Sequence, residues 1–216
     1  MELLPDQYFD QLYARDTDLE RVNEVIRSHG MPEISVASGY GRLLTFLISL
    51  SKAERVLEIG ALGGYSGICL ARGLSPGGEL VSLELRQDYA DIAQINVSAA
   101  GLGDRVRYVV GDASQSLAML HSQGDRFDFF FIDADKENYP HYLDECIRLS
   151  NEGAIIAADN TLLRGKTIDS VKQGPSVLSM REFNRRIAQD PRLVGVHLPA
   201  YDGLALARVI KRKTEF

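Results

Sequence analysis

The chain is poor in cysteine and has no long apolar run, and each absence limits what the protein can be. Its 216 residues include two cysteines, Cys69 and Cys146, both in apolar stretches expected to be helical. We therefore expect two buried thiols and no disulfide. No run of about 18 apolar residues is present, so the sequence predicts no membrane span. Residues 1–6 lack the basic start and apolar core of a secretory signal, which favours a cytoplasmic protein.

An excess of positive charge is also missing. The formal net charge of −6 gives no general attraction to nucleic acid or to anionic membranes. The length and the apolar content of 45% predict one α/β domain over residues 1–216. Residues 5–30 are expected to form two short polar helices with a break near residues 16–18. The N-terminal segment 1–38 either packs on this domain or serves in cap or dimer contacts, and both interpretations stay open.

Apolar strands and helices alternate along the rest of the chain. Near-continuous apolar strands are typical of a parallel sheet with helices on both faces, and two final strands around an Asp-Gly turn predict an antiparallel hairpin. The predicted fold class is therefore α/β, a doubly wound, mostly parallel seven-stranded sheet with a C-terminal antiparallel hairpin. The expected strands are 55–59, 80–84, 106–110, 127–132, 154–158, 193–198 and 204–210. The expected helices are 39–50, 64–74, 86–101, 113–121, 137–149 and 176–189, the first of them burying Leu43, Leu44, Phe46, Leu47 and Leu50.

A glycine-rich turn follows the strand 55–59. Gly60, Gly63 and Gly64 let the backbone approach a ligand closely, and the first N–H groups of the next helix point at the same place. Glu84 ends the following strand, at a spacing from the turn that allows a carboxylate to bind ribose hydroxyls. The pattern predicts a site for a nucleoside cofactor.

The identity of the cofactor is narrowed by what the turn lacks. A dinucleotide fingerprint reads G-x-G-x-x-G, but Leu62 stands where the second glycine would be. Glu58, two residues before the turn, is a poor neighbour for phosphates and a suitable acceptor for an ammonium group. S-adenosylmethionine has an amino acid end and no phosphate, so it fits better than NAD. A dinucleotide, or a turn that binds nothing, remains the alternative.

Oxygen-bearing side chains stand at the ends of two later strands. Asp133 follows the strand 127–132, and Asp159 with Asn160 follows the strand 154–158. In a parallel sheet the carboxyl ends of the strands meet at one edge, where ligands bind. Two carboxylates and an amide suit Mg²⁺ or Mn²⁺, with Ca²⁺ possible. The alternative is that each aspartate only caps the helix after it.

Lys136 stands three residues after Asp133, at an expected helix start. A cation is unfavourable at that end of a helix dipole, so its position calls for a reason. Near a divalent cation and a sulfonium, a lysine should have a depressed pKa and could act as a general base. A solvated surface lysine is the alternative.

Four motifs together resemble the cation-dependent class I O-methyltransferases, the caffeoyl-CoA and catechol O-methyltransferase-like family, from about residue 31 to residue 210. They are Leu57-Glu58-Ile59-Gly60 with Gly64-Tyr65-Ser66, Phe131-Ile132-Asp133-Ala134-Asp135-Lys136-x-x-Tyr139, Asp159-Asn160-Thr161-Leu162 and Asp202-Gly203-Leu204. The resemblance implies a homodimer that requires Mg²⁺, a metal site at Asp133, Asp159 and Asn160, and a catalytic role for Lys136 and Asp133. It also implies that S-adenosylmethionine is bound by Val36, Glu58, Gly60, Ala61, Ser66, Glu84, Ala113 and Asp133.

The methyl acceptor is the least defined part of this prediction. The resemblance implies a small phenolic molecule with two adjacent hydroxyls, and the loop 161–175 and residues 5–38 are expected to shape its pocket. The catechol enzymes carry a glutamate near the final hairpin, where this chain has Leu198-Pro199-Ala200-Tyr201, which favours the caffeoyl-CoA-like bacterial branch over catechol specificity. A tRNA hydroxyuridine is the alternative acceptor. Its basic surface would come from Arg181, Arg185, Arg186, Arg192 and the tail Lys211-Arg212-Lys213.

Overall fold

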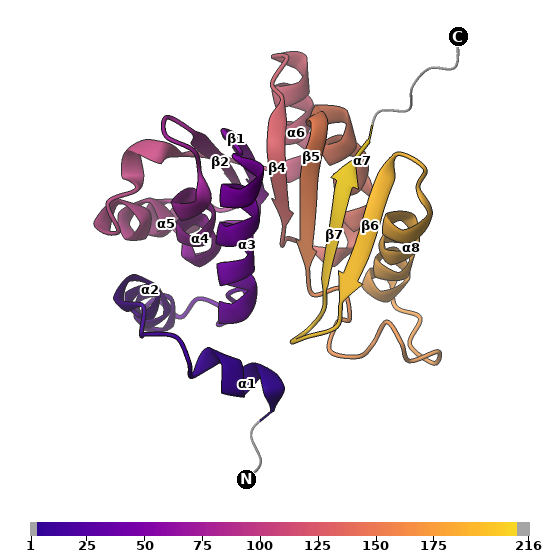
Figure 1. The fold of residues 1–216 in the computed structure, drawn as a ribbon, viewed down its shortest axis with the longest axis horizontal. Helices are drawn as coiled ribbons and strands as arrows, with labels where there is room; N and C mark the ends of the chain where they lie inside the picture. Colours follow the sequence, from indigo (N-terminus) through magenta and orange to yellow (C-terminus); the bar gives the residue numbers. More distant parts are fainter. Residues whose placement is uncertain (1–3, 211–216) are drawn as a thin grey trace. The chain divides into compact units, whose positions relative to one another are not determined.

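The computed structural model describes residues 4–210, which fall into two compact units, one up to Asp112 and one from Ala113. Figure 1 shows the order of the elements along the chain. In the first unit they are the helices α1 (Pro5–Asp10), α2 (Thr17–Ser28), α3 (Ser38–Ser51), α4 (Tyr65–Gly73) and α5 (Gln87–Ala99), the short 3-10 helix η1 (Gly103–Arg105), and the strands β1 (Arg55–Ile59), β2 (Glu79–Glu84) and β3 (Val106–Val110).

The second unit contains the antiparallel end of the chain. Its helices are α6 (Ala113–Ser122), α7 (Tyr139–Leu149) and α8 (Pro175–Gln189), with the 3-10 helix η2 (Lys136–Asn138) before α7. Its strands are β4 (Phe127–Ile132), β5 (Ser150–Asp159), β6 (Leu193–Leu198) and β7 (Leu204–Val209). The predicted elements are therefore present, with ends shifted by a few residues.

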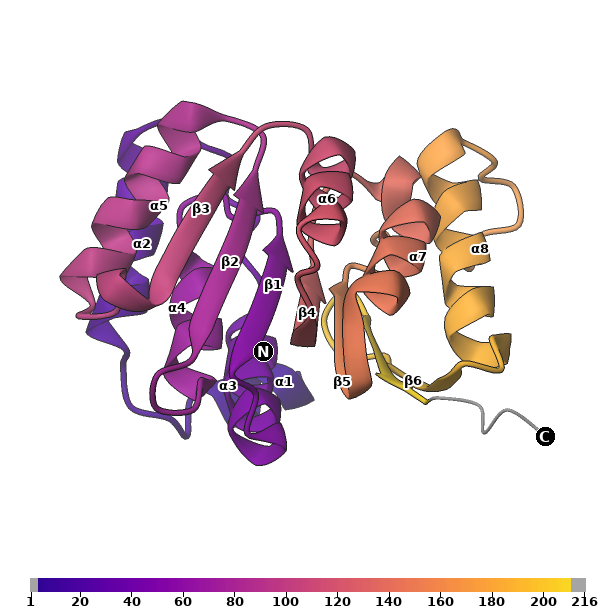
Figure 2. The same ribbon diagram turned by 90° about the horizontal axis from the view of Figure 1, so that it is seen from above.

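The strand pairing follows the predicted change from parallel to antiparallel. In the first unit β1 pairs with β2 and β2 with β3, both parallel. In the second unit β4 and β5 are parallel, whereas β7 runs antiparallel to both β5 and β6. Figure 2 shows α7 and α8 along one face of these last strands, where α7 packs on β4 and β5 and α8 packs on β6 and β7. The antiparallel hairpin 193–198 and 204–209 is confirmed.

One predicted apolar face is wrong. Phe46 and Leu50 of α3, expected to be inside, are 60% and 67% exposed. The buried stripe of α3 is Tyr40, Gly41, Leu44 and Ile48, spaced by three or four residues. This stripe packs toward α4, where a Cβ on Gly41 would lie 2.9 Å from Cys69 Sγ. A helix that packs along one side buries one stripe, so apolar residues on its other side stay in solvent.

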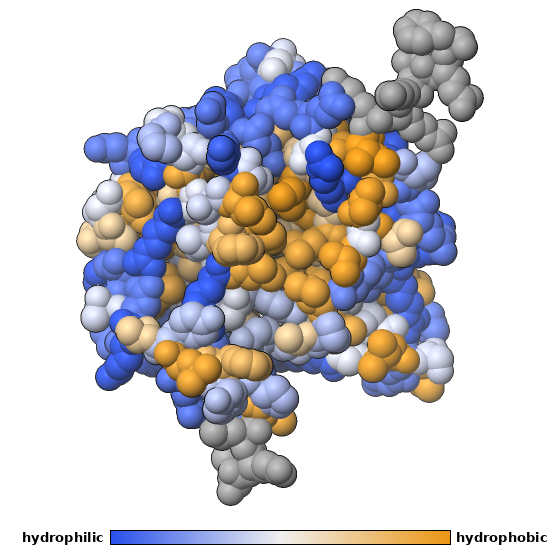
Figure 3. All heavy atoms as spheres, in the orientation of Figure 1, coloured by the Kyte–Doolittle hydropathy of each residue, from blue (hydrophilic) through white to orange (hydrophobic). Residues whose placement is uncertain are grey.

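The N-terminal helices differ in how they pack. Val22 and Ile26 of α2 are buried, and a Cβ on Gly63 would lie 2.5 Å from Ile26, so α2 lies tightly against the glycine-rich turn. Helix α1 has no buried residue, and Tyr8, Phe9 and Leu12 are more than half exposed. Figure 3 shows apolar side chains over α1. The packed-helix interpretation therefore holds for α2.

Both cysteines are buried and free, as expected. Burial raises the pKa of the Cys69 thiol to about 12. A thiol with so high a pKa stays protonated and unreactive at neutral pH.

Candidate active site

The glycine-rich turn has a backbone that side chains rarely allow. Gly60 and Gly64 have φ values of 101° and 86°, and Leu62 has a φ of 47°. A Cβ on Gly64 would lie 3.1 Å from the carbonyl oxygen of Ala93, so this position needs glycine both for its conformation and for space. Leu62 adopts the left-handed region in spite of its side chain, which is a cost found mainly at functional sites. The sequence identified Leu62 as the residue that replaces the second glycine of the dinucleotide fingerprint, and the structure shows its left-handed conformation.

Glu84 is attached to the same turn. Its Oε2 accepts hydrogen bonds from the backbone N–H groups of Ala61 (3.2 Å) and Leu62 (3.0 Å), and its Oε1 accepts one from the N–H of Arg86 (3.0 Å). The side chain is 8% exposed. The structure thus brings together two predicted cofactor residues, Glu84 and Ala61, from neighbouring strand ends. A carboxylate can accept about four hydrogen bonds, so Glu84 retains capacity for a ligand.

Glu58 is completely buried and bound to two hydroxyl groups. Ser66 Oγ donates to its Oε1, and Ser82 Oγ donates to its Oε2 at 2.5 Å. Ser82 is the strand partner of Glu58, and Ser66 lies in the first turn of α4. Each carboxylate oxygen of Glu58 therefore accepts one hydroxyl in a fully buried setting. The structure therefore connects Glu58 to the predicted cofactor residue Ser66.

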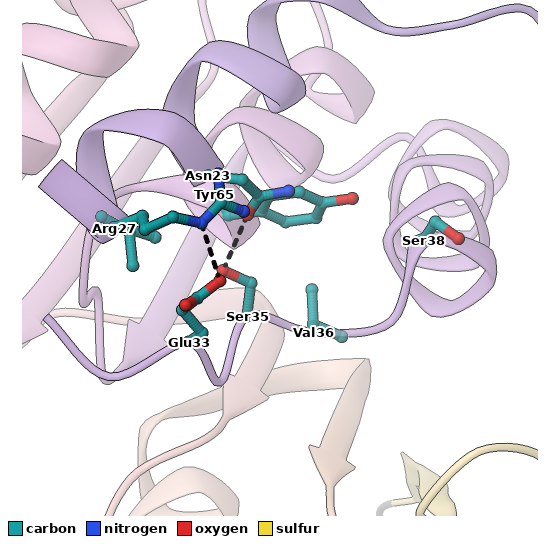
Figure 4. Close-up of a pocket in the computed structure, with 8 residues that line it drawn as sticks. Asn23, Arg27, Glu33, Ser35, Val36, Ser38 and Tyr65 are labelled. Atoms are coloured by element: carbon teal, nitrogen blue, oxygen red, sulfur yellow. Dashed lines mark hydrogen bonds and ion pairs between the residues drawn. The ribbon is translucent and has the colours of Figure 1, made fainter.

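A pocket of about 330 Å³ lies beside these residues in the first unit (Figure 4). It contains Val36, a predicted cofactor residue, and Tyr65, the neighbour of Ser66. Its wall also includes Asn23, Ile26, Arg27, Glu33, Ser35 and Ser38. Sequence reasoning missed Asn23 and Arg27, because nothing local to α2 indicates which side of that helix faces the segment 33–38. Ser35 Oγ lies 3.4 Å from Asn23 Oδ1, and Arg27 pairs with Glu33 at 3.3 Å.

In the second unit, Lys136 lies between an acid and a phenol. Its Nζ donates to Asp133 Oδ1 and to the hydroxyl oxygen of Tyr139, both at 2.7 Å. The side chains of Lys136 and Asp133 are each 19% exposed. The solvated-lysine interpretation is therefore wrong, since this ammonium group has two partners in a partly buried setting.

Tyr139 connects this lysine to the end of β5. It is fully buried, and its hydroxyl donates to the backbone carbonyl oxygens of Asp159 (3.0 Å) and Ile132 (3.2 Å). Burial, with the carboxylates of Asp133 and Asp159 adding to it, raises the pKa of Tyr139 well above its usual value. The phenol therefore stays neutral, with its proton directed at the main chain and its oxygen accepting from Lys136.

Asp159 is held in a site unfavourable to its own charge. It is 4% exposed, and its Oδ1 accepts the N–H of Asn160 at 2.8 Å. Burial, followed by the charge of Asp133, raises the pKa of Asp159 to about 7. Two carboxylates close enough to repel each other, next to an amide, form a donor set that a hard divalent cation would stabilise. Residues 4–210 contain no cluster of three or more His, Cys, Asp or Glu side chains suited to a metal. The role of the Asn160 amide as third ligand stays a prediction.

The turn of the final hairpin fixes the segment that follows Asn160. Thr161 N–H donates to the carbonyl of Gly203 (3.2 Å), and Leu162 N–H donates to that of Asp202 (2.9 Å). A Cβ on Gly203, which has a φ of 81°, would lie 2.5 Å from Thr161 Oγ1. The Asp202-Gly203 motif, predicted as the turn of the hairpin, therefore also holds the backbone beside the predicted metal ligands.

One predicted residue joins neither cluster. Ala113 begins α6 and belongs to the second unit, whereas the other cofactor residues up to Glu84 belong to the first. Its predicted contact with the cofactor stays a prediction.

Comparison with known proteins identifies the family. A family model with the description O-methyltransferase matches residues 12–210. A catechol O-methyltransferase of Niastella koreensis is 38% identical over 94% of this chain and 96% of its own, and one of Mycobacterium tuberculosis is 40% identical over 83% and 82%. The chain belongs to the O-methyltransferase family.

A solved structure extends this result to the fold. The O-methyltransferase of Bacillus cereus in complex with SAH matches with a TM-score of 0.89 and 41% identity, over 94% of this chain and 96% of that one. The predicted fold class is thereby confirmed as an α/β fold with a seven-stranded mixed sheet, mostly parallel, and antiparallel strands in its C-terminal region.

Membership in the O-methyltransferase family also confirms the predicted enzyme class, an S-adenosylmethionine-dependent O-methyltransferase. The NAD alternative finds no support. The relatives that carry the catechol name are 38% and 40% identical, against 29% for a petunia caffeoyl-CoA O-methyltransferase. The expected place in the caffeoyl-CoA-like bacterial branch stays a prediction. Within residues 4–210, no helix is long and apolar enough to cross a membrane.

Proposed function

We propose that this O-methyltransferase transfers the methyl group of S-adenosylmethionine to one of two adjacent hydroxyls on a small phenolic acceptor, with the help of Mg²⁺ or, less favourably, Mn²⁺ or Ca²⁺. The observation that carries the proposal is the network in which Lys136 Nζ bonds to Asp133 and Tyr139, while Tyr139 bonds to the backbone of Asp159. It joins a candidate base to two candidate metal ligands. The names of the Niastella and Mycobacterium relatives support a catechol-like acceptor.

The first unit supplies the groups suited to S-adenosylmethionine, and a relative's structure that contains SAH supports this assignment. Glu84, fixed by three backbone N–H groups of which two belong to the turn, would accept the ribose hydroxyls. Ser66 donates its only proton to Glu58, so its oxygen presents lone pairs to the ammonium group. Glu58 then acts on the cofactor through Ser66. Val36, Gly60 and Ala61 would contribute backbone contacts, and Ala113 and Asp133 would complete the set.

The second unit supplies a donor set that fits a divalent cation. Asp133, Asp159 and Asn160 offer oxygen ligands alone, which favours Mg²⁺ over zinc. A divalent cation at such a site holds two neighbouring acceptor oxygens and lowers the pKa of the hydroxyl that reacts.

Lys136 is placed to take the proton of that hydroxyl. A lysine acts as a base in its neutral amine form, in which two N–H bonds would donate to Asp133 and Tyr139 and the lone pair of Nζ would accept the proton. General base catalysis requires this nitrogen within hydrogen-bond reach of the hydroxyl. The deprotonated oxygen then takes the methyl group in line with the departing sulfur, and S-adenosylhomocysteine is left. Orientation of the two reactants supplies much of the acceleration.

A tRNA acceptor is not favoured by the second unit. Three of its four candidate arginines pair with nearby acids: Arg185 with Glu182, Arg186 with Asp144 and Arg192 with Asp190. The fourth, Arg181, donates to backbone carbonyls. A phosphate would have to displace these partners, which reduces the gain from binding it. The basic tail Lys211-Arg212-Lys213 lies outside the described residues.

We also propose that the enzyme is a homodimer in the cytoplasm and that residues 1–216 form a single domain. The N-terminal segment 1–38 would contribute cap or dimer contacts. The exposed apolar side chains of α1 support this role, because a partner would remove them from water.

The acceptor can be tested by methyl transfer from labelled S-adenosylmethionine to a panel of phenols in the presence of Mg²⁺. The panel contains caffeic acid, a flavonoid catechol, matched analogues with one hydroxyl, and unmodified and hydroxylated tRNA. We expect transfer only to the compounds with two adjacent hydroxyls. Equal transfer to the single-hydroxyl analogues, or transfer to tRNA alone, would contradict the proposal.

A further inference from the structure

The loop between Asn160 and α8 has a folded tip. Asp169 caps it, because its Oδ1 accepts the N–H of Val171 (2.9 Å) and its carbonyl accepts the N–H of Lys172 (3.1 Å). Thr167 is bonded back to Leu162 through both its N–H (3.2 Å) and its hydroxyl (3.0 Å). The segment 166–173 is therefore folded by its own hydrogen bonds, and another element can hold it as a unit.

Arg181 of α8 holds this tip with all three nitrogens of its guanidinium group. Nε donates to the carbonyl of Thr167 (2.9 Å), and Nη2 donates to the carbonyls of Asp169 (2.6 Å) and Lys166 (3.4 Å). Nη1 donates to the side chain of Gln173 at 3.4 Å. The guanidinium group is rigid and planar. Its bonds to three carbonyls of one loop therefore fix both the distance of the loop from α8 and the orientation of the loop.

The other end of the loop is fixed beside the proposed metal ligands. It leaves β5 directly after Asp159, and Asn184, one turn after Arg181 in α8, donates to the carbonyl of Thr161 at 3.0 Å. One helix therefore fixes both the start of the loop and its tip. An acceptor bound at Asp159 and Asn160 would therefore lie next to the start of this loop.

The tip presents two apolar side chains to solvent. Ile168 is 78% exposed and Val171 is 81% exposed, although a loop tip can easily carry polar residues instead. Each would gain from contact with an apolar surface, at about 25 cal/mol per Å² removed from water. An aromatic ring whose hydroxyls are held at the metal ligands is such a surface.

We propose that Arg181 is a positioning residue for the acceptor: it holds the segment 166–173 so that Ile168 and Val171 contact the apolar ring of the phenol. The proposal rests on the proposed function. Arg181 touches neither the cofactor nor the reacting atoms, so its loss should weaken acceptor binding and leave the methyl transfer step intact.

The test compares the wild-type protein with Arg181→Gln, Arg181→Lys and the control Arg185→Gln. Arg185 is exposed on the same helix and bonds to Glu182 and Gln189 of that helix. Three quantities are measured: hydrogen exchange of the segment 166–173, the acceptor KM and kcat, and the affinity for S-adenosylmethionine by calorimetry.

For Arg181→Gln we expect faster exchange in 166–173 and an acceptor KM raised about tenfold, which corresponds to about 1.4 kcal/mol of binding energy. The kcat and the cofactor affinity should stay within about twofold of wild type. Arg181→Lys, which can still donate to a carbonyl, should recover part of the loss, and Arg185→Gln should behave as wild type.

Unchanged exchange in Arg181→Gln would overturn the holding role, and faster exchange with an unchanged acceptor KM would overturn the acceptor role. A wild-type protein that methylates no phenol would overturn the proposed function and the acceptor role with it. Wild-type turnover with a normal Arg181→Gln would overturn only the role of Arg181.

Discussion

Lys136 is the residue on which the proposed proton transfer depends, and its environment distinguishes it from an ordinary surface lysine. We expect Lys136→Met to lower kcat by about a hundredfold to ten-thousandfold, the usual range for loss of a general base. Affinity for S-adenosylmethionine should be retained, because the residues placed around the glycine-rich turn are unchanged. Steady-state kinetics and calorimetry check both statements. Lys52→Met, at an exposed lysine in the first unit, is the control, and a Lys136→Met enzyme with wild-type kcat would remove Lys136 from the mechanism.

Asp159 makes stability depend on pH in the metal-free protein. Its folded pKa, about 7, lies above the ordinary value of 3.8, so the folded state holds a proton that the unfolded state releases. The stability that this provides is full below the ordinary pKa and is lost as the pH rises through the folded one. Between about pH 5 and pH 8 the loss should be about 3 kcal/mol, at about 1.4 kcal/mol per pKa unit.

Urea unfolding of metal-free protein across this range checks the pH effect. Asp159→Asn cannot ionise, so its stability relative to wild type should increase as the pH rises. Asp104→Asn, at an exposed aspartate, should show no such trend. A difference between Asp159→Asn and wild type that does not change with pH would contradict the account.

Sequence could name the residues of the site but not their bonds to one another. The sequence is enough to find Glu58, Glu84, Asp133 and Lys136, because each stands near a strand end or a helix start. The attachment of Glu84 to the turn and of Lys136 to Tyr139 depends on side-chain directions in three dimensions. The same holds for Glu58, predicted as an ammonium acceptor and found bonded to two serines.

At the scale of elements, the final hairpin and the loop after β5 support each other. Gly203→Ala should be destabilising for two reasons, a φ of 81° and a Cβ only 2.5 Å from Thr161 Oγ1. Gly165→Ala is a matched control, since Gly165 has a φ of 79° and no atom within 4 Å of its Cβ. The control should cost about 1 kcal/mol of unfolding free energy, and Gly203→Ala should cost about 1–3 kcal/mol more. Equal costs in urea unfolding would show that the contact between turn and loop contributes nothing.

The elements themselves were predictable where burial is regular. Strands buried on both faces read as apolar runs, so β1 and β4 begin and end where the sequence placed them. Helix α3 was harder, since Phe46 and Leu50 are apolar yet exposed. The clamp of Arg181 on the loop could not be predicted, because its partners are backbone carbonyls that carry no sequence signal.

At the scale of the whole molecule, the two units divide the proposed chemistry. Most of the predicted cofactor residues lie before Asp112, and the proposed metal ligands and base lie after it. Loss of the metal, or of its proposed ligands Asp159 or Asn160, should therefore stop turnover without preventing cofactor binding.

The central claim, metal-dependent methyl transfer, is tested most directly by turnover of a catechol with Mg²⁺ and with EDTA, with cofactor affinity measured under both conditions. The account predicts that EDTA lowers turnover by at least about a hundredfold and that Mg²⁺ restores it. Asp159→Ala should be inactive in both conditions, with an affinity for S-adenosylmethionine within about twofold of wild type. Turnover that is the same with EDTA as with Mg²⁺ would contradict the account.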